Sequence, residues 1–237
     1  MKYAQLVLRP SHCYLCDSIN NHPEIAICEA CISELPYKNQ YCSRCALPIE
    51  TDDSPVCGNC ISNPPSYDIL LSPFEYQFPI DKFITELKFR KKLYNAATLG
   101  HLFTQYIKAQ AKPLPDCIIP VPLHPKRLQQ RGYNQALEIA RSISKNLKIP
   151  IDRQLCQRVI NTEPQSDLTA DERQKNIKNA FKINQQRHYK HVVIFDDVVT
   201  TGQTVEVLAA LLREHNIKII QVWSIARVNP EFKSKFI

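Results

Sequence analysis

The chain has 237 residues, a length that suits one large domain or two small ones. Hydrophobic residues make up 44% of the chain and charged residues 22%, so we expect a buried core rather than global disorder. No apolar run reaches the roughly 18 residues that a membrane span needs, and residues 1–13 lack the cleavage site of a signal peptide. The formal net charge of +7 favours an anionic partner.

Four Cys-x-x-Cys pairs dominate the start of the chain. A turn of this kind aims two thiolates at one point, and two such turns close a tetrahedral zinc site. Four pairs therefore predict two structural Zn²⁺ ions. Pairing of adjacent turns is favoured over pairing of alternate turns, although the spacing alone allows both. His12 and His22 are spare candidates that we expect to be solvent-exposed. The predicted ligands are Cys13, Cys16, Cys28, Cys31, Cys42, Cys45, Cys57 and Cys60.

Residues 1–63 are predicted to form this double zinc-binding module, and residues 67–237 a second domain. The first segment has few large apolar groups, so metal binding is its expected source of folding energy. A disulfide framework is the rival interpretation, but it requires an oxidising compartment. Redox chemistry usually uses one such pair rather than four. The tandem prolines Pro64 and Pro65 indicate a linker between the two parts.

A strand is predicted over residues 67–76, followed by a helix from Ile80 and a second helix over residues 93–110. Ile80, Phe83, Ile84 and Leu87 have helical spacing. We expect Gly100 to mark close packing of the second helix. Basic residues end the first helix, where they suit the helix dipole. They also remain candidates for contact with a nucleic-acid backbone: Lys88, Arg90, Lys91 and Lys92.

A second predicted strand, residues 116–122, leads into a cationic loop and then a helix over residues 133–148. The planar fork of an arginine guanidinium can bind two phosphate oxygens at once. The loop and the start of its helix therefore predict an anion site. The candidate residues are Arg127, Arg131, Gly132, Tyr133, Asn134 and Gln135.

A long polar segment, residues 158–181, follows and contains Arg158, Thr162, Gln165 and Arg173. Loops of this length are often lids over a binding site. An exposed helix over residues 171–178 fits the same segment equally well. Both interpretations stay open at this point.

The most informative stretch is residues 191–204, HVVIFDDVVTTGQT. It predicts a buried strand ending in Asp196 and Asp197, a hydroxyl-rich turn, and a helix over residues 205–213. The unpaired N–H groups and positive dipole end of a helix start suit a phosphate. Adjacent carboxylates repel each other, so they make sense as ligands for sugar hydroxyls or for a metal through water. The turn contains Thr200, Thr201, Gly202, Gln203 and Thr204.

Three strands that lead into helices, together with a last strand over residues 217–227, predict a parallel, doubly wound sheet with its site at the carboxyl ends of the strands. Residues 192–204 resemble, over all thirteen positions, the phosphoribosyl diphosphate (PRPP) loop of the type I phosphoribosyltransferases. An ordinary strand–helix turn with a chance Thr-Thr-Gly is the alternative.

Four features occur here in one order: the cysteine pairs, VPLHPKRLQQRGYNQ, the run TEPQSDLTADERQKNIKNAF, and the PRPP-type loop. Together they resemble the ComF family of phosphoribosyltransferase-like proteins linked to natural competence. The resemblance implies a type I phosphoribosyltransferase-like parallel sheet flanked by helices, behind a small N-terminal double zinc-ribbon module. It also implies a cytoplasmic protein that handles incoming single-stranded DNA, with competence or recombination proteins as further partners.

The same resemblance implies roles for individual residues. Asp196 and Asp197, the candidate catalytic acids, would hold the ribose hydroxyls. Residues 200–204 would hold the 5′-phosphate, and the segment from Arg127 and Arg131 to Gln135 would face pyrophosphate. Mg²⁺ would accompany PRPP, and residues 158–181 would form the flexible loop.

Three functions fit these patterns. The first is a PRPP-binding competence protein that contacts DNA. The second is an active phosphoribosyltransferase that releases pyrophosphate, and the third is a non-catalytic nucleotide sensor. We recognise neither a base-binding hood nor a general base for an acceptor in the sequence. The acceptor, the surface that contacts DNA, the protein partners and the oligomeric state are not determined by the sequence.

Overall fold

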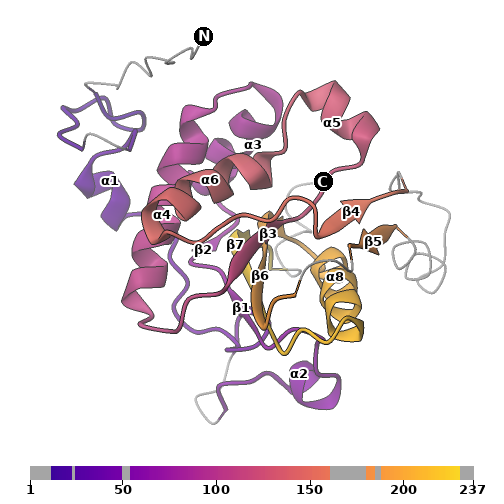
Figure 1. Cartoon of the computed structure of the whole chain (residues 1–237). Coiled ribbons are helices and arrows are strands. Elements are labelled where there is room, and N and C mark those ends of the chain that lie inside the picture. Colours follow the sequence, from indigo (N-terminus) through magenta and orange to yellow (C-terminus); the bar gives the residue numbers. More distant parts are fainter. Residues whose placement is uncertain (1–11, 23–24, 50–53, 161–179, 185–187, 230–237) are drawn as a thin grey trace, which may run out of the picture.

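The computed structural model describes residues 12–22, 25–49, 54–160, 180–184 and 188–229. A parallel sheet lies at the centre of the molecule, with helices on both faces and the cysteine-rich segment at its periphery (Figure 1). None of the helices in these ranges is long and apolar enough to cross a membrane.

The central sheet has the strand order β1-β7-β6-β3, and β2 also pairs with β7. Every one of these pairs is parallel, which confirms the predicted parallel sheet. The predicted strand over residues 67–76 is instead two short strands that follow each other along β7, because Pro73 between them has no N–H to donate. The strands are β1 (Ile69–Leu71), β2 (Phe74–Glu75), β3 (Cys117–Pro120), β6 (His191–Val199) and β7 (Ile219–Arg227).

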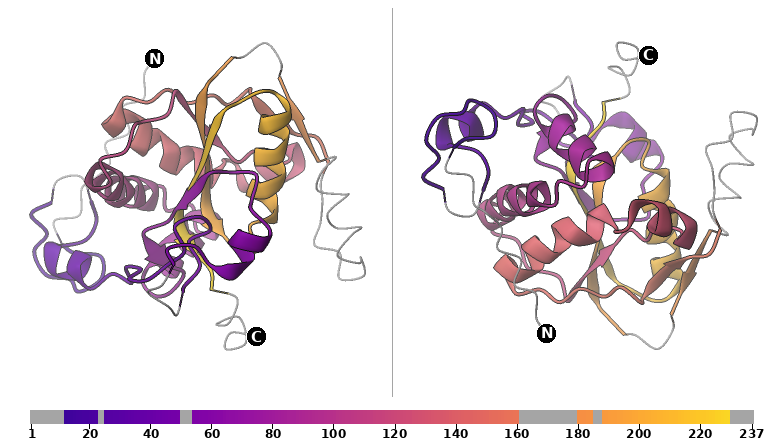
Figure 2. Two further views of the ribbon diagram at one scale, coloured as in Figure 1. Left: turned by 90° about the horizontal axis from the view of Figure 1, so that it is seen from below. Right: turned by 90° about the horizontal axis from the view of Figure 1, so that it is seen from above.

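The helices divide between the two faces of the sheet (Figure 2). Successive side chains of β6 alternate, so Val193 and Phe195 pack in the core formed with α3, α4 and α6, whereas Val192 and Ile194 pack with α8. Both faces of β6 are therefore buried, as its near-continuous apolar run predicts. The helices are α3 (Ile80–Phe89), α4 (Tyr94–Ala109), α6 (Gln135–Leu147) and α8 (Gln203–Glu214).

Helices α4 and α6 approach each other closely at Gly100. A Cβ atom on Gly100 would lie 2.5 Å from the Cβ of Ser142 and 3.0 Å from the carbonyl oxygen of Ile139. The prediction that this glycine marks close packing is confirmed.

The predicted cationic loop after β3 contains a helix, α5 (Pro125–Arg131), so the prediction of a loop there is wrong. Its signals were present in the sequence. His124 precedes the helix and accepts a hydrogen bond from the N–H of Lys126, and Pro125 takes the first helical position. Gly132 ends the helix with φ of 86°, the left-handed conformation that glycine adopts without strain.

A two-stranded antiparallel hairpin, β4 (Cys156–Arg158) with β5 (Phe181–Ile183), flanks the segment predicted as a lid. Residues 161–179 of that segment lie outside the described residues. Thr162, Gln165, Arg173 and the alternative helix over residues 171–178 therefore lie outside them too.

The cysteine-rich segment packs against the rest of the chain. It contains two short helices, α1 (Glu29–Ser33) and α2 (Gly58–Ser62). Cys13, Ile27 and Leu35 belong to the same core cluster as α3, α4 and α6. Backbone hydrogen bonds also join residues 36–44 to the outer edge formed by β1 and β2: Lys38 N to Pro73 O (3.0 Å), Glu75 N to Pro36 O (2.9 Å) and Leu70 N to Arg44 O (2.9 Å). This segment therefore covers one edge of the sheet.

Candidate functional site

The eight cysteines of the four pairs form two quartets, and within each quartet the Sγ atoms lie within 4.8 Å of one another. Tetrahedral zinc with Zn–S bonds of about 2.3 Å requires Sγ atoms roughly 3.8 Å apart. Observed separations are 3.7 Å for Cys13–Cys31, 3.6 Å for Cys16–Cys28 and 3.8 Å for Cys45–Cys57. The first quartet is Cys13, Cys16, Cys28 and Cys31, and the second is Cys42, Cys45, Cys57 and Cys60.

Adjacent turns therefore share each quartet, which confirms the favoured pairing. Backbone N–H groups point at the sulfur atoms, as from Cys28 to Cys13 Sγ (3.3 Å) and from Cys57 to Cys42 Sγ (3.3 Å). Such donors stabilise thiolate charge around a metal. His12 and His22 belong to neither quartet. All-sulfur quartets leave no ligand position open, so the two zinc ions are structural.

The turn between β6 and α8, residues 200–204, is called the phosphate loop below. Gly202 precedes α8 with φ of 85°, so the loop needs the left-handed conformation there. The hydroxyl oxygen of Thr201 lies 3.4 Å from the N–H of Gln203. The loop and Asp196 line one small cavity of about 120 Å³. A helix start, hydroxyl groups and a carboxylate therefore share one space of phosphate size.

Arg227, the last residue of β7, supports the phosphate loop from behind. Its side chain is buried and donates hydrogen bonds to the carbonyl oxygens of Val199 (3.0 Å) and Thr200. Its Nε also donates to the carbonyl oxygen of Cys45, in the second quartet (3.2 Å). Sequence reasoning missed this residue, because only the register of β7 beside β6 brings it under the loop.

Asp196 and Asp197 lie within β6, near its end. Asp197 is 2% exposed, and its carboxylate contacts Nζ of Lys88 at 2.5 Å and Nε2 of Gln135 at 3.3 Å. Asp196 lines the phosphate-loop cavity and accepts a hydrogen bond from the N–H of Asp197 (2.9 Å). The two acids therefore have different surroundings. Lys88 of α3 neutralises Asp197, whereas Asp196 faces the cavity.

These surroundings raise the pKa values of Asp196 and of Lys88. Burial, and next the charge of Asp197, raise the pKa of Asp196 well above its usual value. Burial disfavours the ammonium of Lys88, but the charge of Asp197 and their hydrogen bond outweigh it, so the pKa of Lys88 is raised. The site therefore holds one fixed positive charge beside a carboxylate that resists ionisation.

The Arg-Gly-Tyr-Asn-Gln segment, residues 131–135, is joined to Asp197 through Gln135. Arg131 donates to Oε1 of Gln135 at 2.5 Å, and Gln135 in turn contacts Asp197. Tyr133 donates to the carbonyl oxygen of Leu87, while Asn134 caps α6 and donates to the carbonyl oxygen of Val121 (2.9 Å). These contacts hold the segment next to the acid pair. A pyrophosphate role for it remains a prediction.

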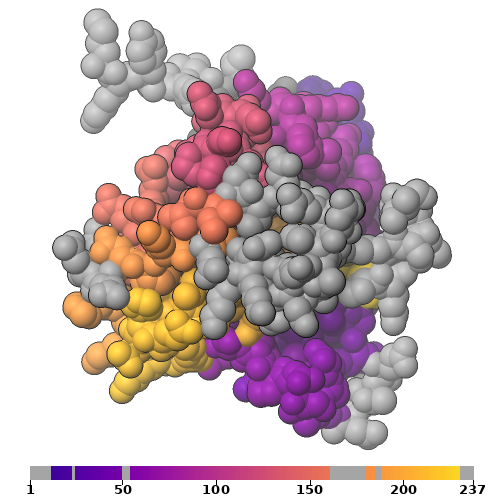
Figure 3. Space-filling view, turned by 90° about the vertical axis from the view of Figure 1, so that its right-hand side faces the viewer, coloured from indigo at the N-terminus to yellow at the C-terminus, as the bar shows by residue number. Residues whose placement is uncertain are grey.

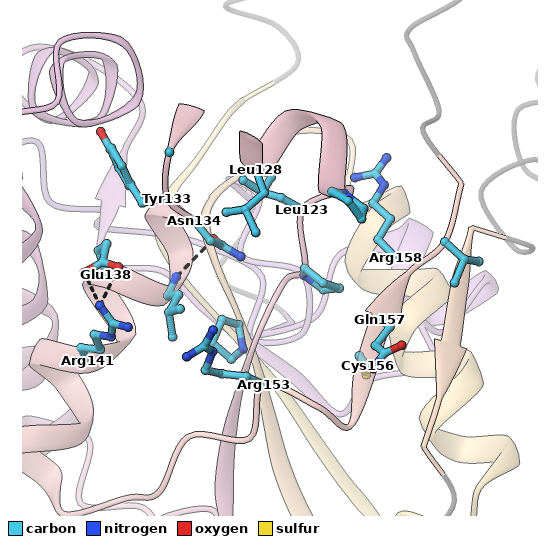
Figure 4. A pocket seen from close by; sticks show the side chains of 16 residues that line it. Leu123, Leu128, Tyr133, Asn134, Glu138, Arg141, Arg153, Cys156, Gln157 and Arg158 are labelled. Carbon is cyan, nitrogen blue, oxygen red and sulfur yellow. Dashed lines mark hydrogen bonds and ion pairs between the residues drawn. The ribbon is translucent and has the colours of Figure 1, made fainter. Parts of the chain in front are cut away.

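A groove of about 750 Å³ runs from this segment to the hairpin (Figure 4). Its walls are apolar at Leu123, Leu128 and several prolines. Arg141, Arg153 and Arg158 also line it, and Arg141 forms an ion pair with Glu138 (2.8 Å) in the same wall. Burial and the positive charge of nearby Arg127 lower the pKa of Arg158, against the opposing charge of Asp196. The charges of Arg127 and Asp196 therefore both act on Arg158, at the hairpin end of the groove. Sequence reasoning missed Arg141 and Arg153, because they meet only in the folded chain.

The four basic residues at the end of α3 do not share one surface. Lys88 turns inward to Asp197, and Lys92 contacts Glu86 at 2.9 Å and Tyr14 at 2.7 Å. Arg90 is exposed and lies 3.7 Å from Glu86. Lys91, also exposed, follows the C-cap residue Arg90 and has a φ of 55°. Only Arg90 and Lys91 therefore remain as outward-facing members of this group.

Two family models match the chain: a double zinc ribbon domain over residues 4–61 and a phosphoribosyl transferase domain over residues 134–233. A relative in Salmonella typhi, DNA utilization protein YhgH, is 34% identical over 92% of this chain and 97% of its own length. Competence protein F of Haemophilus influenzae is 33% identical over 85% of this chain and 90% of its own length. The chain belongs to the ComF family.

As a ComF-family protein, the chain joins a phosphoribosyltransferase-like sheet to a double zinc ribbon. Among solved structures, adenine phosphoribosyltransferase from Leishmania tarentolae is similar with a TM-score of 0.40 and 15% identity, over 73% of this chain and 82% of that one.

Proposed function

We propose that this protein binds PRPP, with the 5′-phosphate in the phosphate loop and the ribose hydroxyls on Asp196 and Asp197. One observation supports this assignment: Asp196 and the start of α8 line a single cavity of about 120 Å³, with Asp197 the next residue along β6. The cavity suits one phosphate group, and the open N–H groups and dipole of α8 favour its charge. Mg²⁺ would neutralise the diphosphate when bound.

A calorimetric titration with PRPP and Mg²⁺ tests this proposal. We expect binding to the wild-type protein and at least a tenfold loss of affinity in the double variant Asp196→Asn, Asp197→Asn. Asp81→Asn, a change on α3 away from the cavity, serves as the matched control. Equal affinity of the double variant and the wild type would overturn the assignment of the acids.

We further propose that the protein contacts single-stranded DNA in natural competence, with the arginine-lined groove as the contact surface. Its relatives carry the names DNA utilization protein and Competence protein F, and the chain has a net charge of +7. The groove combines guanidinium groups with apolar walls, which suit phosphates and bases respectively.

Salt dependence of binding to an oligothymidylate tests this second proposal. Each phosphate contact to a single strand contributes about 0.7 to the slope of log affinity against log salt. Arg141→Gln with Arg153→Gln should reduce that slope by roughly 1.4. Lys108→Gln with Lys112→Gln removes the same charge outside the groove and should change it little. If Arg90→Gln with Lys91→Gln reduces the slope instead, the end of α3 is the contact surface.

Transfer of the phosphoribosyl group is the second candidate function. The groove, at about 750 Å³, is large enough for a nucleotide-sized acceptor, and Arg158 joins it electrostatically to Asp196. An active enzyme would release pyrophosphate from PRPP with some base or amine in a panel of acceptors. Binding of PRPP without release from any acceptor would favour a sensor of nucleotide supply.

A further inference from the structure

The second cysteine quartet is linked to the phosphate loop through one buried side chain. Arg227 is 5% exposed, and its guanidinium donates on one side to Val199 and Thr200 and on the other to Cys45. An arginine fork has donors in a rigid plane, so it fixes the relative positions of the carbonyl oxygens that it contacts. Thr200 begins the loop and Cys45 is a metal-ligating residue, so the two are joined by one group.

The backbone at Cys45 is itself held by the quartet. The Sγ atoms of Cys45 and Cys57 lie 3.8 Å apart, and the N–H of Ala46 donates to the carbonyl oxygen of Cys42 (2.9 Å). Lys38 donates to the carbonyl oxygen of Ala46 from a partly buried position. With metal bound, the carbonyl oxygen of Cys45 is therefore a fixed acceptor for Arg227 rather than part of an adaptable loop.

A second link joins the same part of the chain to the start of α8. The N–H of Ser66 lies 3.1 Å from the carboxylate of Glu206, and the Ser66 hydroxyl donates to it at 2.6 Å. Residues around α2 lie beside α8 in the space-filling view (Figure 3). An acid in the first turn of α8 would repel a phosphate at the loop, and these donors draw Glu206 away. The loop is thus anchored on both sides, at Val199–Thr200 and at Glu206.

The first quartet has different contacts. Tyr14, between two of its ligands, donates to the carboxylate of Glu86 on α3 (2.7 Å), and the N–H of Ala26 donates to the Thr98 hydroxyl on α4 (3.0 Å). Among the described residues, only the first quartet is flanked by a hydrogen bond to α3, and only the second is linked through Arg227 to the phosphate loop, whereas Tyr41 beside the second quartet also contacts Tyr106 on α4 (3.1 Å). Loss of zinc from one quartet therefore serves as the control for loss of zinc from the other.

We propose that zinc at the second quartet and Arg227, as a positioning residue, together hold the phosphate loop in the shape that binds phosphate. This inference rests on the proposed binding of PRPP at that loop and adds what keeps the loop ready. Zinc at the first quartet supports α3 and α4 instead. The double zinc ribbon therefore contributes to ligand affinity through one of its two ions.

Two measurements on the full-length protein test this inference: calorimetric titration with PRPP and Mg²⁺, and backbone hydrogen exchange at residues 199–205 without ligand. Arg227→Lys keeps the charge but loses the fork. We expect at least tenfold weaker PRPP binding and faster exchange at residues 199–205, with the zinc content of the protein unchanged. Arg90→Lys is the control, because Arg90 is exposed at the end of α3 and lies 3.7 Å from Glu86, so this change keeps the charge and leaves both anchors of the loop intact. Wild-type exchange and affinity in Arg227→Lys would overturn the proposal.

The quartets are compared by Cys60→Ser and Cys31→Ser, each of which should halve the zinc content. Faster exchange at residues 199–205 is expected only for Cys60→Ser, and faster exchange in α3 only for Cys31→Ser. If Cys60→Ser loses its zinc and leaves exchange at residues 199–205 unchanged, the proposed link is wrong. Should either cysteine variant fail to fold, the Arg227→Lys result decides alone. If the wild type binds no PRPP, the proposed function fails, while the exchange measurements still test the link.

Discussion

Asp196 and Asp197 are neighbours in β6, yet their surroundings differ, because Lys88 pairs with the charge of Asp197 and burial favours the neutral form of Asp196. The carboxylate of Asp197 has a lysine ammonium at 2.5 Å, whereas Asp196 faces the phosphate-loop cavity with a raised pKa. A raised carboxyl pKa means that the folded state holds the proton more tightly than the unfolded state. Its contribution to stability is therefore present at low pH and is lost as pH rises through the folded-state pKa.

Asp196→Asn should for this reason stabilise the protein at neutral pH, because an amide does not ionise. We expect a gain on the order of 1 kcal/mol in the free energy of unfolding at pH 7. The gain should shrink as pH falls towards about 4, the ordinary value for an aspartate. Urea unfolding across this pH range measures it.

Asp116 provides a control with the opposite sign. Backbone N–H groups of His191 and Lys190 donate to its carboxylate and lower its pKa. Asp116→Asn should therefore cost stability at neutral pH, and that cost should disappear as pH falls through the lowered pKa. A stability difference for Asp196→Asn that does not vary with pH would contradict the account of its burial.

At this scale the sequence indicated residue types better than residue partners. The local order of strand, acids, threonines and glycine was enough to predict the phosphate loop with Gly202 at its turn. The contact between Lys88 and Asp197 joins α3 to β6, elements far apart in the chain, so no local pattern reports it. The role of Arg227 was not predicted for the same reason, because it depends on the pairing of β7 with β6.

At the scale of elements, the packing of α4 on α6 depends on the absence of a Cβ atom at Gly100. A Cβ on Gly100 would approach Ser142 Cβ to 2.5 Å, and the backbone oxygen of Ile139 to 3.0 Å. Gly100→Ala should therefore lower the free energy of unfolding by about 2 kcal/mol, since the clash exceeds the gain of roughly 1 kcal/mol in helix propensity.

The double variant Gly100→Ala, Ser142→Gly tests whether this clash is the cause. Removing the Ser142 side chain opens space for the new methyl group, so the two effects should be non-additive by more than about 0.5 kcal/mol. Chemical denaturation of the four proteins in the cycle measures the coupling. Additive effects would mean that Gly100 matters for another reason.

Element types were largely predictable, because apolar periodicity in α3, α6, α8 and β6 is strong. The exceptions have local causes. Helix α5 was read as a loop, since its seven residues bury no apolar face and only its caps identify it. The strand after the linker was predicted as continuous, and Pro73 divides it. The β4–β5 hairpin joins segments on either side of a long polar stretch, so its pairing is not visible locally.

For the whole molecule, the decisive observation is that the cysteine-rich segment shares the main core. Cys13, Ile27 and Leu35 lie in the same cluster as Trp223, which is 1% exposed and is the chain's single tryptophan. Composition suggested a module that metal alone holds together. Composition could not reveal that the module also packs its few apolar residues into the neighbouring core.

Removal of zinc should therefore change the thermal unfolding that Trp223 fluorescence reports, although no ligand cysteine is near Trp223 in the sequence. We expect stripping of zinc with a strong chelator to lower the midpoint of thermal unfolding followed by Trp223 fluorescence by several degrees, since a loss of 1 kcal/mol shifts such a midpoint by about 2–4 °C. Re-addition of Zn²⁺ should restore it, and Mg²⁺ should not. A Trp223 transition that ignores zinc would show that the two parts unfold independently.

The strip of residues 36–44 along β1 and β2 has a further consequence, which concerns solubility. The open edge of a parallel sheet offers unpaired N–H and C=O groups, and another chain can pair with it. Here that edge is capped by a segment whose two ends lead into zinc ligands, Cys31 and Cys45. Loss of metal would thus do more than loosen a small module, because it would uncover a template for strand pairing between molecules. The protein should then aggregate more readily in a cell that is short of zinc, and also in buffers that contain a chelator.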